Sequence, residues 1–385
     1  MCAAIAPRPG AGGCGPVTVP WAGRGTAVRT KSRKTTFSRA ALAVTVLALA
    51  AAGCGKSSTE SGGGGSSASA GTYSGKGIGL AYDVGGKGDQ SFNDAAFAGF
   101  QKAEKEFGIG GRDVEPSDNE SSADKVQRLE QLARAGYNPV IGVGFVYAPA
   151  VKEVAAKYPK VTFGIVDDDT VKAKNVADLL FDAEQSSYLA GVAAAKATKK
   201  HHIGFIGGVD VPLIHTFEAG FDQGARSVDP KIKIESQYLT QTAQEGGFSS
   251  PDKGKDAASG QIEAGADVIY HAAGLSGQGV IQSAAQHKVW AIGVDSDQYK
   301  QSSLADYKDW ILGSALKNVG GAVYELTRSV VQGKPLSGEV RGDLKSGGVG
   351  FADSNPRYRA MKDVVAAVEK ARQDIIDGKV TVEAR

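Results

Sequence analysis

Acidic side chains follow several predicted strands, at the point where each strand ends. The stretch from Tyr82 to Asp94 is rich in glycine and leads from a strand into a helix, while Asp167 and Asp295 each come directly after an apolar run. In sheets of parallel strands, ligands bind at these carboxyl ends. The pattern therefore predicts a binding site that is lined by carboxylates.

Two aromatic residues lie in loops of the same kind. Phe92 lies near the end of the glycine-rich stretch, and Phe248 lies in a loop after another strand. Phe217 stands four residues before Phe221, a spacing typical of side chains that pack one helix face. Carboxylates accept hydrogen bonds from hydroxyls, and aromatic rings stack on bases. These residues suit a neutral polyhydroxyl ligand that carries a flat ring.

Each feature also has a purely structural interpretation. The acids at 167–169 are typical of a solvated loop, and Asp295 can cap a turn or a helix. Ser91 or Asn93 can cap the helix that follows the glycine-rich stretch. Capping leaves unexplained an aspartate at a strand end together with an aromatic side chain in the same loop.

The sequence lacks the residue patterns that several kinds of catalytic and metal-binding sites require. The sequence has no G-x-S-x-G motif and no phosphate-loop motif, its five histidines show no metal-binding spacing, and no cysteine follows Cys54. Asp295 and Asp297 alone are too few for a site of hard oxygen ligands. We therefore expect no catalytic residues, no cofactor and no bound metal.

The charge of the chain is unevenly distributed. Lys and Arg number 44 and Asp and Glu 42, but residues 1–53 hold seven of the basic residues and none of the acidic ones. The remainder has 37 basic and 42 acidic residues, a net charge of −5. Because nucleic-acid binders usually show a basic surface, we expect no nucleic-acid partner.

The N-terminal segment has the composition of a targeting signal. After a basic stretch that ends at Arg39, an apolar run over 40–52 is too short to span a bilayer. It leads to Cys54 through a sequence that resembles a bacterial lipobox, with Ala51 in place of the usual leucine. We expect residues 1–53 to be a signal segment, Cys54 to carry lipid, and 54–72 to be a flexible tether. An ordinary signal peptide is the alternative, and a true start at Val28 would explain residues 1–27.

Apolar runs alternate with amphipathic stretches from Tyr73 onward. This alternation predicts an α/β protein whose parallel sheets are covered by helices on both faces. About 330 residues and this many units indicate two lobes, with a single eight-stranded barrel as the competing fold. We expect strands at 77–82, 139–145, 161–166, 203–207, 232–238, 268–271 and 290–294, and helices at 93–107, 122–135, 150–157, 185–198, 213–227, 254–264, 280–286, 319–331 and 358–377.

The sequence resembles the basic membrane protein (BMP) family of ABC-transporter substrate-binding lipoproteins, whose studied members bind purine and other nucleosides. The resemblance covers residues 77–369 and implies a type I periplasmic-binding-protein fold: two doubly wound parallel-sheet lobes joined by a hinge of three crossings. We expect 73–183 with about 297–335 in the first lobe, and 184–296 with about 336–385 in the second. The segments that carry the resemblance are 83–86, 91–93, 184–195 (EQSSYLAGVAAA), 204–221 (GFIGGVDVPLIHTFEAGF), 265–274 (GADVIYHAAG), 293–298 (GVDSDQ) and 317–319.

The resemblance also implies a function and roles for single residues. The expected protein is a receptor anchored by lipid on the extracytoplasmic face of the cell membrane, which captures a nucleoside, with a purine favoured, and delivers it to an ABC permease. A receptor for a simple sugar or signalling molecule, a sensory ectodomain and a nucleoside-cleaving enzyme are the alternatives. The roles are Phe92 and Phe248 on the two faces of the base, with Phe217 as the alternative to Phe248. Asp167 with Asn93 is expected at the edge of the base, Asp295 and Lys317 at the ribose hydroxyls, and Asp83 and Gly274 as further lining.

Overall fold

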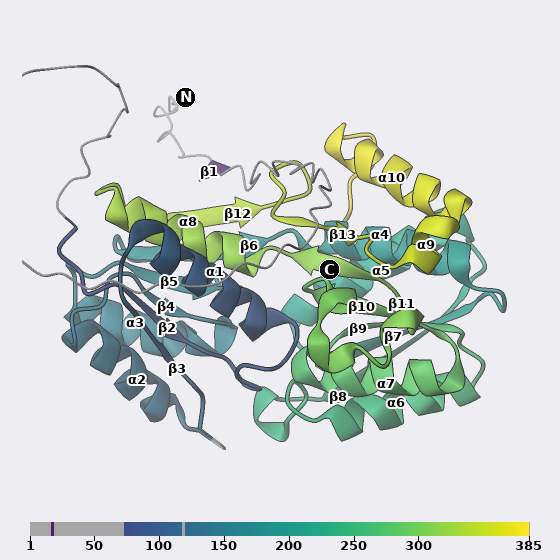
Figure 1. Ribbon diagram of the computed structural model, residues 1–385, viewed down its shortest axis with the longest axis horizontal. Helices are drawn as coiled ribbons and strands as arrows, with labels where there is room; N and C mark the ends of the chain where they lie inside the picture. Colours follow the sequence, from purple (N-terminus) through teal and green to yellow (C-terminus); the bar gives the residue numbers. More distant parts are fainter. Residues whose placement is uncertain (1–16, 19–72, 118–119, 385) are drawn as a thin grey trace, which may run out of the picture. The chain divides into compact units, whose positions relative to one another are not determined.

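The computed structural model describes residues 17–18, 73–117 and 120–384 (Figure 1). The predicted signal segment is described only at 17–18, and the tether at 54–72 and the lipidated Cys54 lie outside the described residues. Within the described part, no helix has the length and apolar character needed to cross a membrane.

The first sheet is parallel throughout. Four of its strands, at 78–81, 140–142, 163–166 and 176–181, are mainly apolar and buried, as expected for strands that are covered by helices on both faces. Among the described residues it has the order β1–β12–β6–β5–β4–β2–β3. The strands are β1 (Val17–Thr18), β2 (Ile78–Ala81), β3 (Gly111–Val114), β4 (Val140–Gly142), β5 (Phe163–Val166), β6 (Val176–Phe181) and β12 (Gly338–Gly342).

The second sheet has the order β13–β11–β10–β9–β7–β8 in the described part of the chain. All neighbours are parallel except β13, which runs antiparallel to β11 at the edge. The strands are β7 (His202–Val209), β8 (Lys233–Thr240), β9 (Val268–Ala272), β10 (Trp290–Asp295), β11 (Ile311–Lys317) and β13 (Val349–Ala352). Two separate sheets exclude the single barrel.

Helices cover both faces of each sheet. In the first lobe α1 packs on α8 and α2 on α3, and in the second lobe α4 packs on α5 and α6 on α7, with α10 against α4 (Figure 1). The helices are α1 (Phe92–Phe107), α2 (Ser122–Arg134), α3 (Ala148–Lys157), α4 (Ala183–Ala197), α5 (Pro212–Val228), α6 (Pro251–Glu263), α7 (Gly277–His287), α8 (Val319–Val331), α9 (Pro356–Ala360) and α10 (Lys362–Ile376). Short 3₁₀ turns are η1 (Phe145–Tyr147), η2 (Ala243–Glu245), η3 (Gly274–Ser276), η4 (Gln298–Lys300), η5 (Ser302–Leu304) and η6 (Lys308–Trp310).

The chain passes between the lobes three times. It crosses at Asp182 between β6 and α4, at Asn318 between β11 and α8, and over 343–348 between β12 and β13. Backbone hydrogen bonds tie the crossings together, since Asp182 N donates to Gly342 O at 2.9 Å and Asn318 N to Gly348 O at 2.8 Å. The expected two-lobed α/β fold is therefore confirmed.

The C-terminal part of the chain is divided between the two lobes in a different way from the one expected. Residues 311–317 were expected in the first lobe but form β11 of the second sheet, and 338–342 were expected in the second lobe but form β12 of the first. The pattern at 297–335 revealed only the helix. Which sheet a strand joins depends on pairing with residues far away in the chain, which local periodicity does not encode.

Candidate ligand-binding cleft

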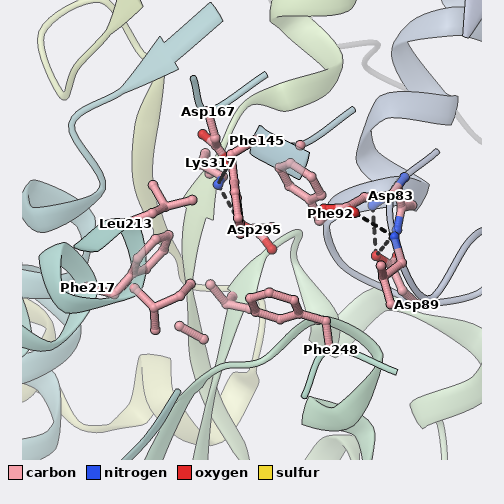
Figure 2. A pocket seen from close by; sticks show the side chains of 17 residues that line it. Asp83, Asp89, Phe92, Phe145, Asp167, Leu213, Phe217, Phe248, Asp295 and Lys317 are labelled. Atoms are coloured by element: carbon pink, nitrogen blue, oxygen red, sulfur yellow. Dashed lines mark hydrogen bonds and ion pairs between the residues drawn. The ribbon is translucent and has the colours of Figure 1, made fainter. Parts of the chain in front are cut away.

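All eight residues expected to bind ligand line one cleft between the lobes. The cleft holds about 510 Å³ of space that is not filled by protein atoms, part of it open to solvent. In Figure 2, Asp295 and Lys317 lie between Asp83 and Asp89 on one side and Leu213 and Phe217 on the other. The eight are Asp83, Phe92, Asn93, Asp167, Phe248, Gly274, Asp295 and Lys317.

The first-lobe side of the cleft is built by the loop between β2 and α1. Asp89, which is 1% exposed, accepts hydrogen bonds from the backbone N–H groups of Ser91, Asn93 and Asp94 at 2.8–3.1 Å. It thereby caps the start of α1, where backbone donors have no partners within the helix. Neither Ser91 nor Asn93 caps this helix through its side chain, so that part of the structural interpretation was wrong.

Asn93 holds the loop together rather than pointing freely into the cleft. Its Oδ1 accepts from the backbone N–H of Asp83 at 3.0 Å, and its Nδ2 donates to Asp89 Oδ2 at 3.2 Å. An amide carries two N–H donors, so one donor of Asn93 stays available to a ligand. The Asp83 carboxyl accepts from Val84 N at 2.7 Å.

A buried cluster of opposite charges joins the two lobes at the centre of the cleft. Lys317 Nζ lies 2.5 Å from Asp167 Oδ2 and 3.7 Å from Asp295 Oδ1, and all three side chains are 4–7% exposed. Asp295 Oδ2 also accepts from Ser91 Oγ, across the lobes, at 2.7 Å. The second-lobe Lys317 therefore binds a carboxylate from each sheet.

Both acids of this cluster have a strained backbone. Asp167 follows β5 with a φ of 63°, and Asp295 ends β10 with a φ of 60°. Residues other than glycine rarely take this left-handed conformation, although aspartate tolerates it better than most. Strain of this kind concentrates at functional sites, where it turns a side chain toward a ligand.

Burial shapes the electrostatics of the cleft. It raises the pKa of Asp83 to about 7, and it also raises the pKa of Asp295, although Lys317 opposes that shift. Burial alone would lower the pKa of Lys317, but Asp167 and Asp295 outweigh it and raise this pKa. The lysine is thus held as a cation against the two acids.

Aromatic rings line the cleft together with the charged cluster. Lys317 Nζ lies 4.6 Å from the centre of the Phe92 ring and 5.3 Å from that of Phe217. Phe92 and Phe248 are half-buried, whereas Phe217 is 3% exposed and packs within the core of the second lobe. The Phe248 ring lies against β7 at Gly208, where an added Cβ atom would come within 2.4 Å of the ring.

Several lining residues were missed by sequence reasoning. Asp89 lies inside the predicted loop, and its spacing to the start of α1 is the signal that could have identified it as a cap. Phe145 begins a 3₁₀ turn after β4, and no local pattern distinguishes it from a core aromatic. The helical spacing of Phe217 predicted only that it packs a helix face, and the family resemblance named it as the alternative to Phe248. The additional lining residues are Val84, Asp89, Gly144, Phe145, Leu213, Ile214, Phe217, Ala272 and Val294.

The cleft brings together carboxylates, amides, aromatic rings and one lysine. The described residues contain no group of three or more His, Cys, Asp or Glu side chains able to hold a metal ion. Such a set can bind hydroxyl and amine groups by charge-assisted hydrogen bonds and hold a flat ring by stacking.

A model of the family of PnrA-like ABC transporter substrate-binding proteins, Bmp, matches residues 78–385. The chain belongs to this family. The resemblance inferred from the sequence is confirmed, and the Bmp chain is a substrate-binding protein of an ABC transporter. Membership implies a small-molecule ligand and a permease as partners.

Curated relatives extend along most of the chain. Over 321 residues the Bmp chain is 37% identical to the ABC transporter nucleoside-binding protein BmpA of Lactococcus lactis subsp. cremoris, which covers 80% of this chain and 88% of that protein. It is 33% identical over 287 residues to an uncharacterized lipoprotein of Pyrococcus horikoshii, covering 72% of this chain and 68% of that protein. These names point to the extracytoplasmic side of a membrane.

Solved structures show the same fold. The Bmp chain matches an ABC transporter solute-binding protein from Aeropyrum pernix with a TM-score of 0.69 and 27% identity, over 80% of this chain and 93% of that one. The two-lobed architecture is therefore shared with periplasmic binding proteins of ABC transporters.

Proposed function

We propose that this Bmp protein captures a nucleoside, with a purine favoured, in the cleft between its lobes and delivers it to an ABC permease without changing it chemically. The observation that carries the proposal is the buried Lys317 cluster between aromatic rings. A nucleoside combines a flat base with a ribose that bears hydroxyls, and the cleft offers a partner for each part.

Asp295 and Lys317 are the proposed partners of the ribose hydroxyls. Asp295 accepts from a hydroxyl and Lys317 donates to one, so a pair of neighbouring hydroxyls meets a neighbouring acceptor and donor. Because both side chains are almost completely buried, a ligand that failed to satisfy them would leave charged groups unpaired at a substantial cost.

Phe92 and Phe248 are the proposed partners of the base faces. Both rings are half-buried and line the cleft from opposite lobes, so lobe closure brings one toward each face of a ligand. Phe217 is packed into the second-lobe core, which favours Phe248 as the second ring. Asp167 and the free N–H donor of Asn93 are proposed to form hydrogen bonds with the edge of the base. Asp83 and Gly274 are proposed as further lining of the site.

We further propose that Cys54 carries the lipid that holds the protein on the outer face of the cell membrane, tethered through residues 54–72. The support is the lipobox-like end of the apolar segment and the relatives that are named lipoproteins. Mass spectrometry of the membrane fraction tests this proposal. A peptide that begins at Cys54 with acyl chains is expected, and a peptide that begins at an unmodified residue would contradict it.

Calorimetric titration with adenosine, guanosine, inosine, uridine and cytidine tests the ligand class. We expect micromolar or tighter binding of at least one, with purines ahead of pyrimidines. Free D-ribose and free adenine serve as controls, because a receptor for a simple sugar would bind ribose as well as it binds a nucleoside. If none of the five nucleosides binds, the proposed ligand class is wrong.

A further inference from the structure

A loop of the first lobe is held by side chains of the second lobe at a place beside the cleft. We call residues 88–91, which precede α1, the bridging loop. Three of its carbonyl oxygens accept hydrogen bonds from second-lobe side chains. Gln278 Nε2 donates to Gly88 O at 2.8 Å, Gln298 Nε2 to Gln90 O at 3.2 Å, and Ser296 Oγ to Ser91 O at 2.9 Å.

The bridging loop presents its backbone in a way that suits these contacts. Its N–H groups are taken up inside the first lobe, since Gly88 N and Gln90 N donate to Asp94 at 2.8 and 3.0 Å. The left-handed backbone of Gly88, with a φ of 92°, and of Gln90, with a φ of 57°, turns the chain sharply here. A carbonyl oxygen has two lone pairs, so Gly88 O, which also accepts from Gln90 Nε2 at 3.3 Å, and Ser91 O, which also accepts from Ala95 N at 3.1 Å, can each accept a second bond from the other lobe.

The second-lobe donors are set in place by their own surroundings. Gln298 is fully buried, and its Oε1 accepts from Val294 N and from His271 Nε2, both at 3.0 Å. These two bonds fix the orientation of the amide, so that its Nε2 faces the carbonyl of Gln90. Gln278 lies in the first turn of α7. Neither residue lines the cleft, and nor does Ser296.

We propose that Gln278, Ser296 and Gln298 are positioning residues that favour lobe closure through the bridging loop and raise ligand affinity without contacting the ligand. Phe92 directly follows the loop and Asp295 directly precedes Ser296, so these bonds place an aromatic ring of one lobe against the charged cluster of the other. A ligand that enters the open cleft is retained by closure, so apparent affinity rises with the stability of the closed form relative to the open one. The effect on affinity rests on the proposed function, whereas the effect on closure does not.

The effect on closure can be measured without ligand. Because residues after Cys54 contain no cysteine, replacing Cys2, Cys14 and Cys54 by serine leaves a clean background for spin labels. Labels at Lys152→Cys on α3 and Glu263→Cys on α6, both exposed positions, report the distance between the lobes. We expect a closed component in the ligand-free protein, and the ratio of closed to open protein should fall about two- to tenfold in Gln278→Ala, as for the loss of one hydrogen bond.

Gln282→Ala is the matched control. Gln282 lies one turn further along α7, and its Nε2 donates to Tyr307 Oη at 3.1 Å within the second lobe. This variant should retain the parent distance distribution. A ligand-free protein without a closed component, or a Gln278→Ala distribution that matches the Gln282→Ala one, would overturn the proposal.

The effect on affinity is measured with the nucleoside that binds best. Gln278→Ala should bind it about two- to tenfold more weakly through faster dissociation, with the thermal midpoint of the ligand-free protein unchanged. If the parent protein binds no nucleoside, the proposed function fails while the distance measurement still decides the closure claim. Weaker binding in Gln278→Ala that comes wholly from slower association would contradict the closure mechanism.

Discussion

The cleft has a wall from each lobe, and the two walls place an aspartate in the same way but hold the surrounding residues differently. Asp167 of the first lobe and Asp295 of the second each stand at the carboxyl end of a parallel strand with a left-handed backbone. The rest of the first wall comes mainly from one segment, 83–93, whose backbone is held by Asp89. The second wall joins Phe248, Gly274 and other residues from separate segments.

This difference separates two consequences of mutation. In the first wall, a local loop folds around its own acid, so a change there should affect the stability of α1. In the second wall, Lys317 and Asp295 meet because β10 and β11 are neighbours in the sheet, and they form a charged pair that lines the cleft. A change there should affect binding more than folding.

The largest effect is expected from Asp295→Ala. The change removes the proposed hydroxyl acceptor and leaves the Ser91 hydroxyl without its Asp295 partner in the other lobe. We expect nucleoside binding to weaken about 100-fold, as for truncating one member of a buried charge pair. Calorimetry measures this, with Asp306→Ala, an exposed acid of the same lobe, as the control. A loss below threefold would mean that the second wall does not hold the ligand.

Phe92→Ala should weaken binding about 10- to 100-fold, since stacking one base on an aromatic ring contributes about 1–3 kcal/mol. Phe107→Ala is the matched control, because Phe107 ends the same helix and stacks on Tyr324 away from the cleft. Both affinities are read by calorimetry. Equal affinities in the two variants would remove Phe92 from the proposed site.

Asp89→Ala tests the support of the first wall. We expect the free energy of unfolding to fall by about 2 kcal/mol, because the start of α1 loses its cap. Urea denaturation measures it, with Asp363→Ala, an exposed acid in the first turn of α10, as the control. If the two variants are equally stable, the local capping interpretation of this wall is wrong.

Asp83 is expected to make the stability of the protein depend on pH. Burial raises its pKa in the folded protein to about 7, above the ordinary value of 3.8 in the unfolded chain. Its contribution to stability is therefore fully present below about pH 4 and is lost as the pH rises to about 7, with a slope of at most about 1.4 kcal/mol per pH unit. Asp83→Asn should flatten this part of the curve in urea denaturation at several pH values, and an unchanged slope would contradict the shift.

The contrast between the walls also explains what could be predicted from sequence. The residues that follow strands were identified because strand ends are visible in local periodicity, and the structure brings Asp83, Asp167 and Asp295 into one cleft. Lys317 was placed only by family resemblance, since the apolar run before it was not identified as a strand. The lobes expected for β11 and β12 were wrong, because the sheet that a strand joins depends on pairing with residues far away in the chain. No local sequence pattern indicates that Gln278 forms a hydrogen bond across the lobes.

Binding of one nucleoside in the cleft through the Lys317 cluster can be observed by native mass spectrometry of the purified protein in an equimolar mixture of the five nucleosides and D-ribose. We expect a mass increase equal to one nucleoside, a purine before a pyrimidine, in the parent protein and in Asp306→Ala but not in Asp295→Ala. A mass increase equal to ribose, or a nucleoside retained equally by Asp295→Ala, would contradict it.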